Sequence, residues 1–152
     1  MGDFLINIKQ LKSQVCEIIE KKVKNVGMIA GGTGITPMIQ IIRAVLRNEN
    51  DPTKLSLLFA NKEEKDIILR DKLENPDRDF SDRFEVHYTL DKAKDGWLGF
   101  TGFIDEEMIR NTMPEPSEET LILLCGPPKM NSEAVKPALE SIGYSPDSIF
   151  NF

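Results

Sequence analysis

The apolar residues of the chain are grouped in short runs. Runs over residues 26–30, 55–60 and 120–125 are each long enough for one buried strand. Residues 84–90 alternate apolar and polar side chains, which predicts a further strand, and residues 148–152 predict a final edge strand. The hydrophobic pattern therefore predicts five strands.

Segments with apolar residues at helical spacing separate these strands. They predict helices over 37–48, 66–73 and 105–110, and a last helix that ends near Ser141 with a kink near Pro137. Strands that alternate with helices, several of them apolar throughout, are typical of a parallel sheet covered on both faces. The predicted fold class is α/β, with a doubly wound, mainly parallel five-stranded sheet.

Capping residues mark the beginnings of three of these helices. The hydroxyl of Thr36 and the carboxylates of Asp66 and Asp105 can each accept hydrogen bonds from free amide groups at a helix N-terminus. Pro37 would then occupy the first helical position, where a missing N–H costs nothing. We therefore expect a firm boundary at the start of the first helix.

Composition narrows the classes of function. The 152 residues, 40% of them apolar, suffice for one domain with a substantial core. The net charge is −6 and the basic residues are scattered apart from a short cluster at 21–24, which argues against a nucleic-acid partner. Cys16 and Cys125 lie far apart and His87 has no partner motif, so we expect neither a disulfide framework nor a metal site. The apolar runs are too short for a signal peptide or a membrane span, which predicts a cytoplasmic protein.

Three glycines within four residues follow the first predicted strand. Gly31, Gly32 and Gly34 allow positive φ angles or close backbone approach, and the turn leads into a helix N-terminus that suits a pyrophosphate. The fingerprint Gly-x-Gly-x-x-Gly would have Pro37 in place of its third glycine, so the helix must pack differently on the strand. No Gly-Lys-Ser or Gly-Lys-Thr follows, which excludes a P-loop. Taken alone, the motif also fits an ordinary strand-to-helix turn.

Two more features follow predicted strands. Asp91 comes directly after the strand at 84–90, and Cys125–Pro128 closes the strand at 120–125. Alone, Cys125 would be a buried strand-end residue and Asp91 a solvated loop acid. Because ligands of open parallel sheets bind at the carboxyl ends of the strands, their common location with the glycine turn favours a nucleotide site.

Five motifs support one another: Gly31–Met38, Leu58–Asn61, Tyr88–Asp91, Gly102–Ile109 and Cys125–Met130. Together they resemble NADH-cytochrome b5 reductases, a branch of the ferredoxin reductase superfamily, from about Val26 to Phe152. The resemblance implies a Rossmann-like NAD-binding domain over residues 26–152, with NADH as a cofactor. In that family a flavin-binding barrel precedes this domain, hydride passes from NADH to FAD, and single electrons pass on to cytochrome b5 or a similar haem acceptor.

The resemblance also implies roles for individual residues. Cys125 would sit beside the reacting nicotinamide carbon, as the catalytic position. Asp91 would hold the adenosine ribose, Phe103 the adenine, and the terminal Phe152 would lie near the flavin edge. The whole cofactor-binding set comprises Gly31, Gly32, Thr33, Gly34, Thr36, Pro37, Asp91, Phe103, Gly126, Pro127, Met130 and Phe152.

The chain departs from the family in one respect. The flavin motif Arg-x-Tyr followed by Ser or Thr does not occur, and only about 25 residues precede the first strand, too few for a barrel. Gly2–Ile6 resembles the segment that closes the flavin domain. We therefore expect residues 1–25 to be a linker or the end of a FAD-binding domain. That domain would be this chain's partner within a longer protein, and the chain alone would be inactive without it. A segment further upstream could anchor the full-length protein to a membrane.

Two alternatives stay open. The same motifs occur in the reductase end of nitrate reductase and of other cytochrome-b5-fused proteins, which only the upstream sequence separates from a free reductase. A non-catalytic nucleotide-sensing domain is the other alternative. Cys125 and Phe152 speak against a sensor, since such a domain has no need of residues that face a flavin.

Overall fold

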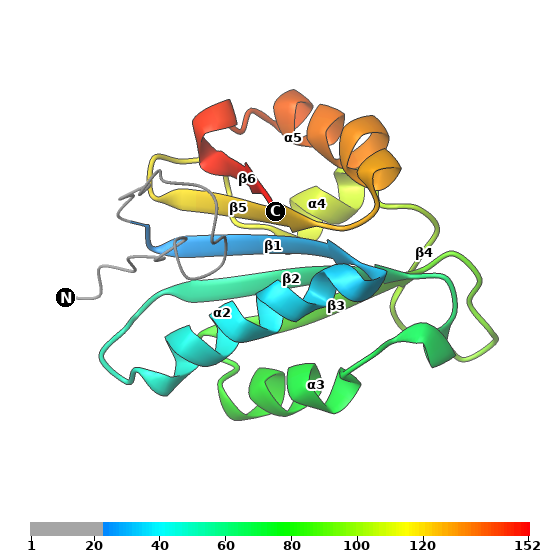
Figure 1. Ribbon diagram of the computed structural model, residues 1–152, viewed down its shortest axis with the longest axis horizontal. Helices are drawn as coiled ribbons and strands as arrows, with labels where there is room; N and C mark the ends of the chain where they lie inside the picture. Colours follow the sequence, from blue (N-terminus) through cyan, green and yellow to red (C-terminus); the bar gives the residue numbers. More distant parts are fainter. Residues whose placement is uncertain (1–22) are drawn as a thin grey trace.

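A computed structural model of the chain describes residues 23–152, and the expectations for residues 1–22, Cys16 included, lie outside this range. The described part is a six-stranded sheet with helices on both faces (Figure 1). Its neighbouring strands are all parallel, in the order β4-β3-β2-β1-β5-β6. The strands are β1 (Asn25–Gly31), β2 (Lys54–Asn61), β3 (Phe84–Leu90), β4 (Phe100–Thr101), β5 (Thr120–Cys125) and β6 (Ile149–Asn151).

The doubly wound α/β class is confirmed, but the count of five strands was wrong by one. The additional strand, β4, pairs only with Thr89 and Leu90 of β3. A strand of two residues cannot display the alternation on which strand prediction depends. The glycines on either side of it, Gly99 and Gly102, predict a loop instead.

The helices form one layer on each face of the sheet (Figure 1). They are α2 (Ile35–Arg47), α3 (Arg70–Asp79), α4 (Glu106–Thr112) and α5 (Lys136–Ile142). Successive residues of β1 point to opposite layers, since Met28 packs with α2 and α3 whereas Ile29 packs with α4 and α5. Both residues are fully buried. This double burial explains why β1 reads as a continuous apolar run.

The first helix begins differently from the prediction. Gly32–Gly34 form a 3₁₀ turn, η1, and α2 begins at Ile35 with no side chain capping it. Thr36 and Pro37 are therefore the second and third helical residues, and Thr36 is not the cap. The reason is that Gly34 already has helical angles (φ −63°, ψ −5°), so the extended position that a capping residue needs lies further upstream. Pro37 is tolerated because amides of the first turn lack intrahelical partners.

The second predicted helix also begins elsewhere. Asp66 belongs to a 3₁₀ turn, η2 (Glu64–Asp66), where it accepts a hydrogen bond from the amide of Glu63 at 3.1 Å. The α-helix itself begins at Arg70, after Leu69. The apolar spacing of 66–73 thus predicted a helix of the right kind about one turn too early, because a capping-box turn and a helix start carry the same local signals.

The later elements agree more closely with the sequence. The carboxylate of Asp105 accepts a hydrogen bond from the Met108 amide at 2.8 Å, which confirms it as the cap of α4. The irregularity expected near Pro137 takes the form of a π-helical turn, η3 (Met130–Val135), directly before α5. A short 3₁₀ turn, η4 (Pro146–Ser148), leads into β6, which is the edge strand predicted at the C-terminus.

Because of its two tyrosines, we expect the chain to have a lower free energy of unfolding at alkaline pH. Burial raises the pKa of Tyr144 to about 12, and its hydroxyl donates to the Pro114 carbonyl; burial also raises the pKa of Tyr88. Since these folded-state pKa values exceed the unfolded value of 10.0, the stabilisation is complete below that pH and is lost as the pH rises through the folded values. We expect denaturant unfolding to give a constant free energy up to about pH 9.5 and a falling one above, with a smaller fall in Tyr144→Phe. Equal alkaline losses in both proteins would contradict this role of Tyr144.

Candidate functional site

The sheet has a topological switch point between β1 and β5. From β1 the chain adds β2, β3 and β4 on one side, whereas β5 and β6 lie on the other. Ala30, next to the end of β1, is opposite Cys125 at the end of β5. Since all strands are parallel, the carboxyl ends meet at one edge, and the crevice there is where such sheets bind ligands.

Three glycines let the two strand ends come together. A Cβ on Gly34 would lie 2.1 Å from the carbonyl oxygen of Cys125, and one on Gly126 would lie 2.5 Å from Cε of Met130. A Cβ on Gly31 would lie 2.9 Å from Sδ of Met130 and 3.0 Å from Cδ of Pro127. At Gly34 the clash would be with backbone atoms that cannot rotate away, so the close approach of the two strand ends requires a residue without a side chain there. The structure thus brings together Gly31, Gly34, Cys125, Gly126, Pro127 and Met130 of the predicted set.

The rim of this crevice is exposed backbone. Gly32, with φ +54°, and Thr33 are exposed in η1, and Thr36 is exposed in the first turn of α2. The segment Gly31–Pro37 carries no charged side chain. Free amide groups at the start of a 13-residue helix, with the positive end of its dipole, provide the attraction for an anion here.

Cys125, the last residue of β5, and Phe152, directly after β6, lie at the same edge of the sheet. Both are half-buried and pack against the core layer of α2. The backbone amide of Phe152 donates to the Leu124 carbonyl at 2.9 Å, and its ring meets Phe150 edge-on at 5.1 Å between centroids. The C-terminal aromatic ring is therefore held one strand away from the thiol.

Asp91 and Phe103 lie on the other side of the glycine turn. The amide of Asp91 donates to the Asn61 carbonyl at 3.1 Å, and its carboxylate is exposed just beyond β3. Phe103 follows β4 and is 79% exposed, after Gly102 with φ +91°. Asp91 is two strands from the glycine turn, or about 10 Å at ordinary strand spacing. An extended dinucleotide can bridge that separation.

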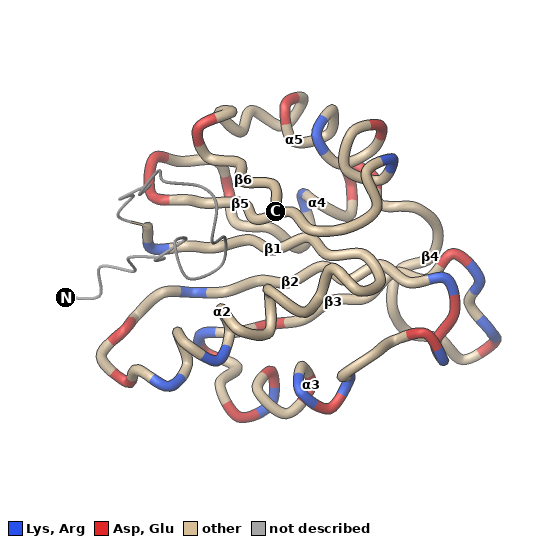
Figure 2. Tube along the Cα trace, in the orientation of Figure 1, with Lys and Arg blue, Asp and Glu red and all other residues tan. Residues whose placement is uncertain are grey.

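Charged groups are distributed unevenly along this edge. Figure 2 shows both signs interspersed in the loops beyond β2 and β3, around Lys62–Asp66 and Asp91–Asp95, whereas the glycine turn is free of charged side chains. The amide of Lys92 donates to the carbonyl of Lys62 at 2.8 Å, which brings the two loops together. Asp91 therefore lies in a region of mixed charge that includes Lys62, Lys92 and Lys94.

Two buried polar residues at this edge, Asn61 and Asn131, are outside the predicted set of site residues. Asn61 ends β2, is 7% exposed, and its Nδ2 has no hydrogen-bond partner among the described residues. Asn131, in η3, donates from Nδ2 to Oδ1 of Asn151 at 3.2 Å. In the sequence, the signal for Asn61 was a polar amide at the end of an apolar strand, and for Asn131 a polar amide at the start of a helical turn. Apolar packing does not explain a buried amide at either position.

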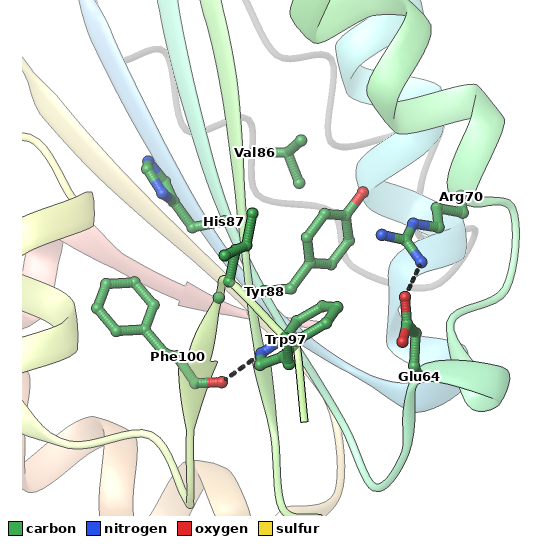
Figure 3. A pocket seen from close by; sticks show the side chains of 10 residues that line it. Glu64, Arg70, Val86, His87, Tyr88, Trp97 and Phe100 are labelled. Carbon is green, nitrogen blue, oxygen red and sulfur yellow. Dashed lines mark hydrogen bonds and ion pairs between the residues drawn. The ribbon is translucent and has the colours of Figure 1, made fainter. Parts of the chain in front are cut away.

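A cleft also lies away from the switch point. Figure 3 shows it at the outer edge of β3, with a volume of about 520 Å³. It is lined by Glu64, Arg70, Val86, His87, Tyr88, Gly96, Trp97, Leu98, Gly99 and Phe100, none of them in the predicted set. We retain the switch point as the candidate nucleotide site, because an open shelf that binds an extended ligand does not have to be the deepest hollow. Trp97 donates from Nε1 to the Phe100 carbonyl at 2.9 Å and so anchors the loop before β4.

No group of three or more His, Cys, Asp or Glu side chains within residues 23–152 could hold a metal ion. No helix in the same range is both long and apolar enough to cross a membrane.

Comparison with known proteins defines the class of this domain. Residues 28–136 match the family model of the oxidoreductase NAD-binding domain, and the chain belongs to that family. More narrowly, the resemblance to NADH-cytochrome b5 reductases is confirmed over the nucleotide-binding part. The chain is 55% identical to NADH-cytochrome b5 reductase 3 of Rattus norvegicus over 134 residues, which cover 88% of this chain and 44% of the relative. It thus spans less than half the length of that relative.

Solved structures agree with this assignment. The cytochrome b5 reductase domain of Ulva prolifera nitrate reductase is 41% identical, with a TM-score of 0.86 over 88% of this chain and 52% of that one. The CS-b5R domains of human Ncb5or, solved in the NAD⁺ form, are 28% identical with a TM-score of 0.74, over 86% of this chain and 37% of that one. The fold is therefore that of the NAD-binding domain of ferredoxin-reductase-like flavoproteins.

Proposed function

We propose that this chain is the NADH-binding half of a flavoprotein reductase, which passes hydride from NADH to FAD and then single electrons to cytochrome b5 or a similar haem acceptor. Residues 26–152 form the NADH-binding domain, and residues 1–25 are a linker or the end of a FAD-binding domain outside this chain. The observation that carries the proposal is the meeting of the glycine turn with Cys125 and Gly126 at the switch point. The identity to the rat reductase supports it.

Different residues along the carboxyl edge of the sheet bind different parts of NADH. The backbone amides of Gly31–Gly34 and the N-terminus of α2 bind the pyrophosphate, and Asp91 accepts hydrogen bonds from the adenosine ribose hydroxyls. Phe103, which is exposed after β4, stacks on the adenine. Met130 covers the glycines and closes one wall of the cleft.

The reacting end of the nucleotide lies against apolar groups. Cys125 packs beside the nicotinamide as a small polarisable group, and Phe152 keeps water from the same edge. Their task is to orient the nicotinamide, since reacting atoms must be held in close register. FAD, when bound, supplies the change from two-electron to one-electron chemistry. The half-buried Phe152 and the exposed Thr36 fit a surface that a second domain completes.

A second candidate is the reductase end of a nitrate reductase. The structural match to the algal nitrate reductase domain favours it. Both candidates share the transfer from NADH to FAD and differ only in the protein that receives the electrons.

Joining the chain to the FAD-binding half of the rat reductase tests the proposal. After mixing with NADH in a stopped-flow instrument, the flavin absorbance is expected to bleach. The chain alone, as a control, is expected to be colourless and to lack NADH:ferricyanide activity. A flavin that stays oxidised although NADH binds would contradict hydride transfer and would favour a nucleotide sensor.

Replacing Cys125 by Ser in the joined protein tests the catalytic position. The hydroxyl would alter packing and hydrogen bonding beside the nicotinamide, so turnover is expected to fall about fivefold while NADH affinity changes little. Cys125→Ala, which keeps the position apolar, is the matched control and is expected to retain more turnover. Full turnover in the Ser variant would make Cys125 a packing residue only.

A further inference from the structure

One guanidinium links four segments around the cleft at the outer edge of β3. Arg70, the first residue of α3, pairs with Glu64 at 2.9 Å and with Glu74 at 2.5 Å. Its Cζ lies 5.6 Å from the ring centre of Tyr88 and 5.8 Å from that of Trp97 (Figure 3). These contacts come from η2, α3, β3 and the loop after β3. Because Tyr88 and Trp97 also meet each other edge-on at 6.3 Å, the cation and the two rings form one cluster.

The loop that Trp97 anchors is otherwise exposed. Within residues 91–99, Trp97 alone is half-buried and every other residue is exposed. Backbone hydrogen bonds from Asp91 and Lys92 hold the start of the loop on the end of β2. Further along the loop, the indole of Trp97 contacts Arg70, Tyr88 and the Phe100 carbonyl. These contacts hold this part of the loop against α3 and β3.

Backbone strain directly precedes Arg70. Leu69 has φ +55° and ψ +31°, and it is the only non-glycine residue with positive φ among residues 23–152. This left-handed conformation is unfavourable for a residue with a side chain. Leu69 is 45% exposed, so burial of its side chain does not compensate for the strain. The sharp turn between η2 and α3 is instead what places Arg70 facing the rings.

Stability alone does not account for this arrangement. The side chains of Arg70, Glu64 and Glu74 are 39%, 52% and 46% exposed, and ion pairs between half-exposed groups contribute little. The two carboxylates nevertheless fix the plane of the guanidinium, and a planar guanidinium stacks on aromatic rings in a way that a lysine ammonium does not. What the cluster supplies is orientation of Trp97.

We infer that Arg70 is a positioning residue for the adenosine side of the nucleotide site. It holds Trp97, and Trp97 holds the loop that begins with Asp91 and leads through β4 to Phe103. The inference rests on the proposed function, in which Asp91 and Phe103 contact adenosine. It assigns no role to Arg70 at the glycine turn, which lies on the far side of β2.

Trp97 is the single tryptophan of the chain, so its fluorescence reports on the loop directly. The test compares the 152-residue chain with Arg70→Lys, and uses Arg78→Lys as the control in the same helix. Arg78 pairs with Asp79 on the exposed side of α3. In Arg70→Lys we expect quenching of Trp97 by acrylamide to rise about twofold and the affinity for AMP and NADH to fall about three- to tenfold. Affinity for inorganic pyrophosphate, the probe of the glycine turn, is expected to stay unchanged, as are all values in Arg78→Lys.

These measurements distinguish a positioning role of Arg70 from a purely structural one. Unchanged quenching and AMP affinity in Arg70→Lys would overturn the inference, and so would an equal loss of AMP and pyrophosphate, which is what a merely structural residue would give. A wild-type chain that binds none of the three ligands would instead contradict the proposed function on which the inference depends. Should Arg70→Lys fail to fold by circular dichroism, Glu64→Gln removes one of the two carboxylates that hold the same guanidinium without touching either ring, and the same changes are expected at smaller size.

Discussion

Replacing Gly34 by Ala is expected to destabilise the fold by about 3 kcal/mol or more and to abolish NADH binding. The new Cβ would lie 2.1 Å from the carbonyl oxygen and 2.5 Å from the carbonyl carbon of Cys125. These are backbone atoms of β5, so no side chain can rotate away, and the end of β5 must separate from the glycine turn. The backbone of Gly34 has φ −63°, which suits alanine, so the whole effect comes from the clash.

Gly32→Ala is the matched control for this change. A Cβ at Gly32 would meet nothing within 4 Å, and the positive φ of +54° is the only cost, roughly 1 kcal/mol. Urea unfolding of the two variants measures the difference. Equal losses of stability would show that the approach of the two strand ends is not the reason for the glycine at position 34.

Replacing Asp91 by Thr is expected to weaken NADH binding by about 1–3 kcal/mol and to improve NADPH binding. The carboxylate accepts hydrogen bonds from the ribose hydroxyls of NADH, whereas the 2′-phosphate of NADPH would bring like charges together. Because the discrimination is largely repulsion, it relaxes when the charge is removed. Lys92 follows the position directly, so a 2′-phosphate would then have a cation nearby without the Asp91 carboxylate.

Asp95→Thr is the control for this prediction, because Asp95 is an exposed acid in the middle of the same loop. Both variants lose one negative charge, so a general electrostatic effect would appear in both. Calorimetry with NADH and NADPH separates the cases. An unchanged preference in Asp91→Thr would leave Asp91 a solvated loop residue.

The sequence predicted most of the fold because the central strands are buried on both faces. β3 and β5 occupy the predicted residues, since an alternating or continuous apolar run has clear ends. β4 was missed because its two residues owe their conformation to pairing with Thr89 and Leu90, which is a tertiary effect. The starts of α2 and α3 were misplaced because a 3₁₀ turn precedes each helix, and the one before α3 has a capping box that resembles a helix start.

The candidate site was predictable to a similar degree. The meeting of Gly34 with Cys125 follows from the location of both motifs at carboxyl ends of adjacent strands, once the strand order is known. The cluster around Arg70 was not predictable. Its members come from four segments, and the turn at Leu69 that orients Arg70 has no sequence signal, because leucine rarely adopts positive φ.

The most direct test of the account is an NMR titration of the ¹⁵N-labelled chain with NADH. The central claim is that NADH binds across the carboxyl edge of the sheet, with its pyrophosphate on the glycine turn and its adenosine near Asp91. We expect saturable shifts in the amide signals of Gly31–Ile35 and Gly126, together with those of Asp91 and Phe103. No shifts, or shifts confined to the cleft at the outer edge of β3, would contradict the claim.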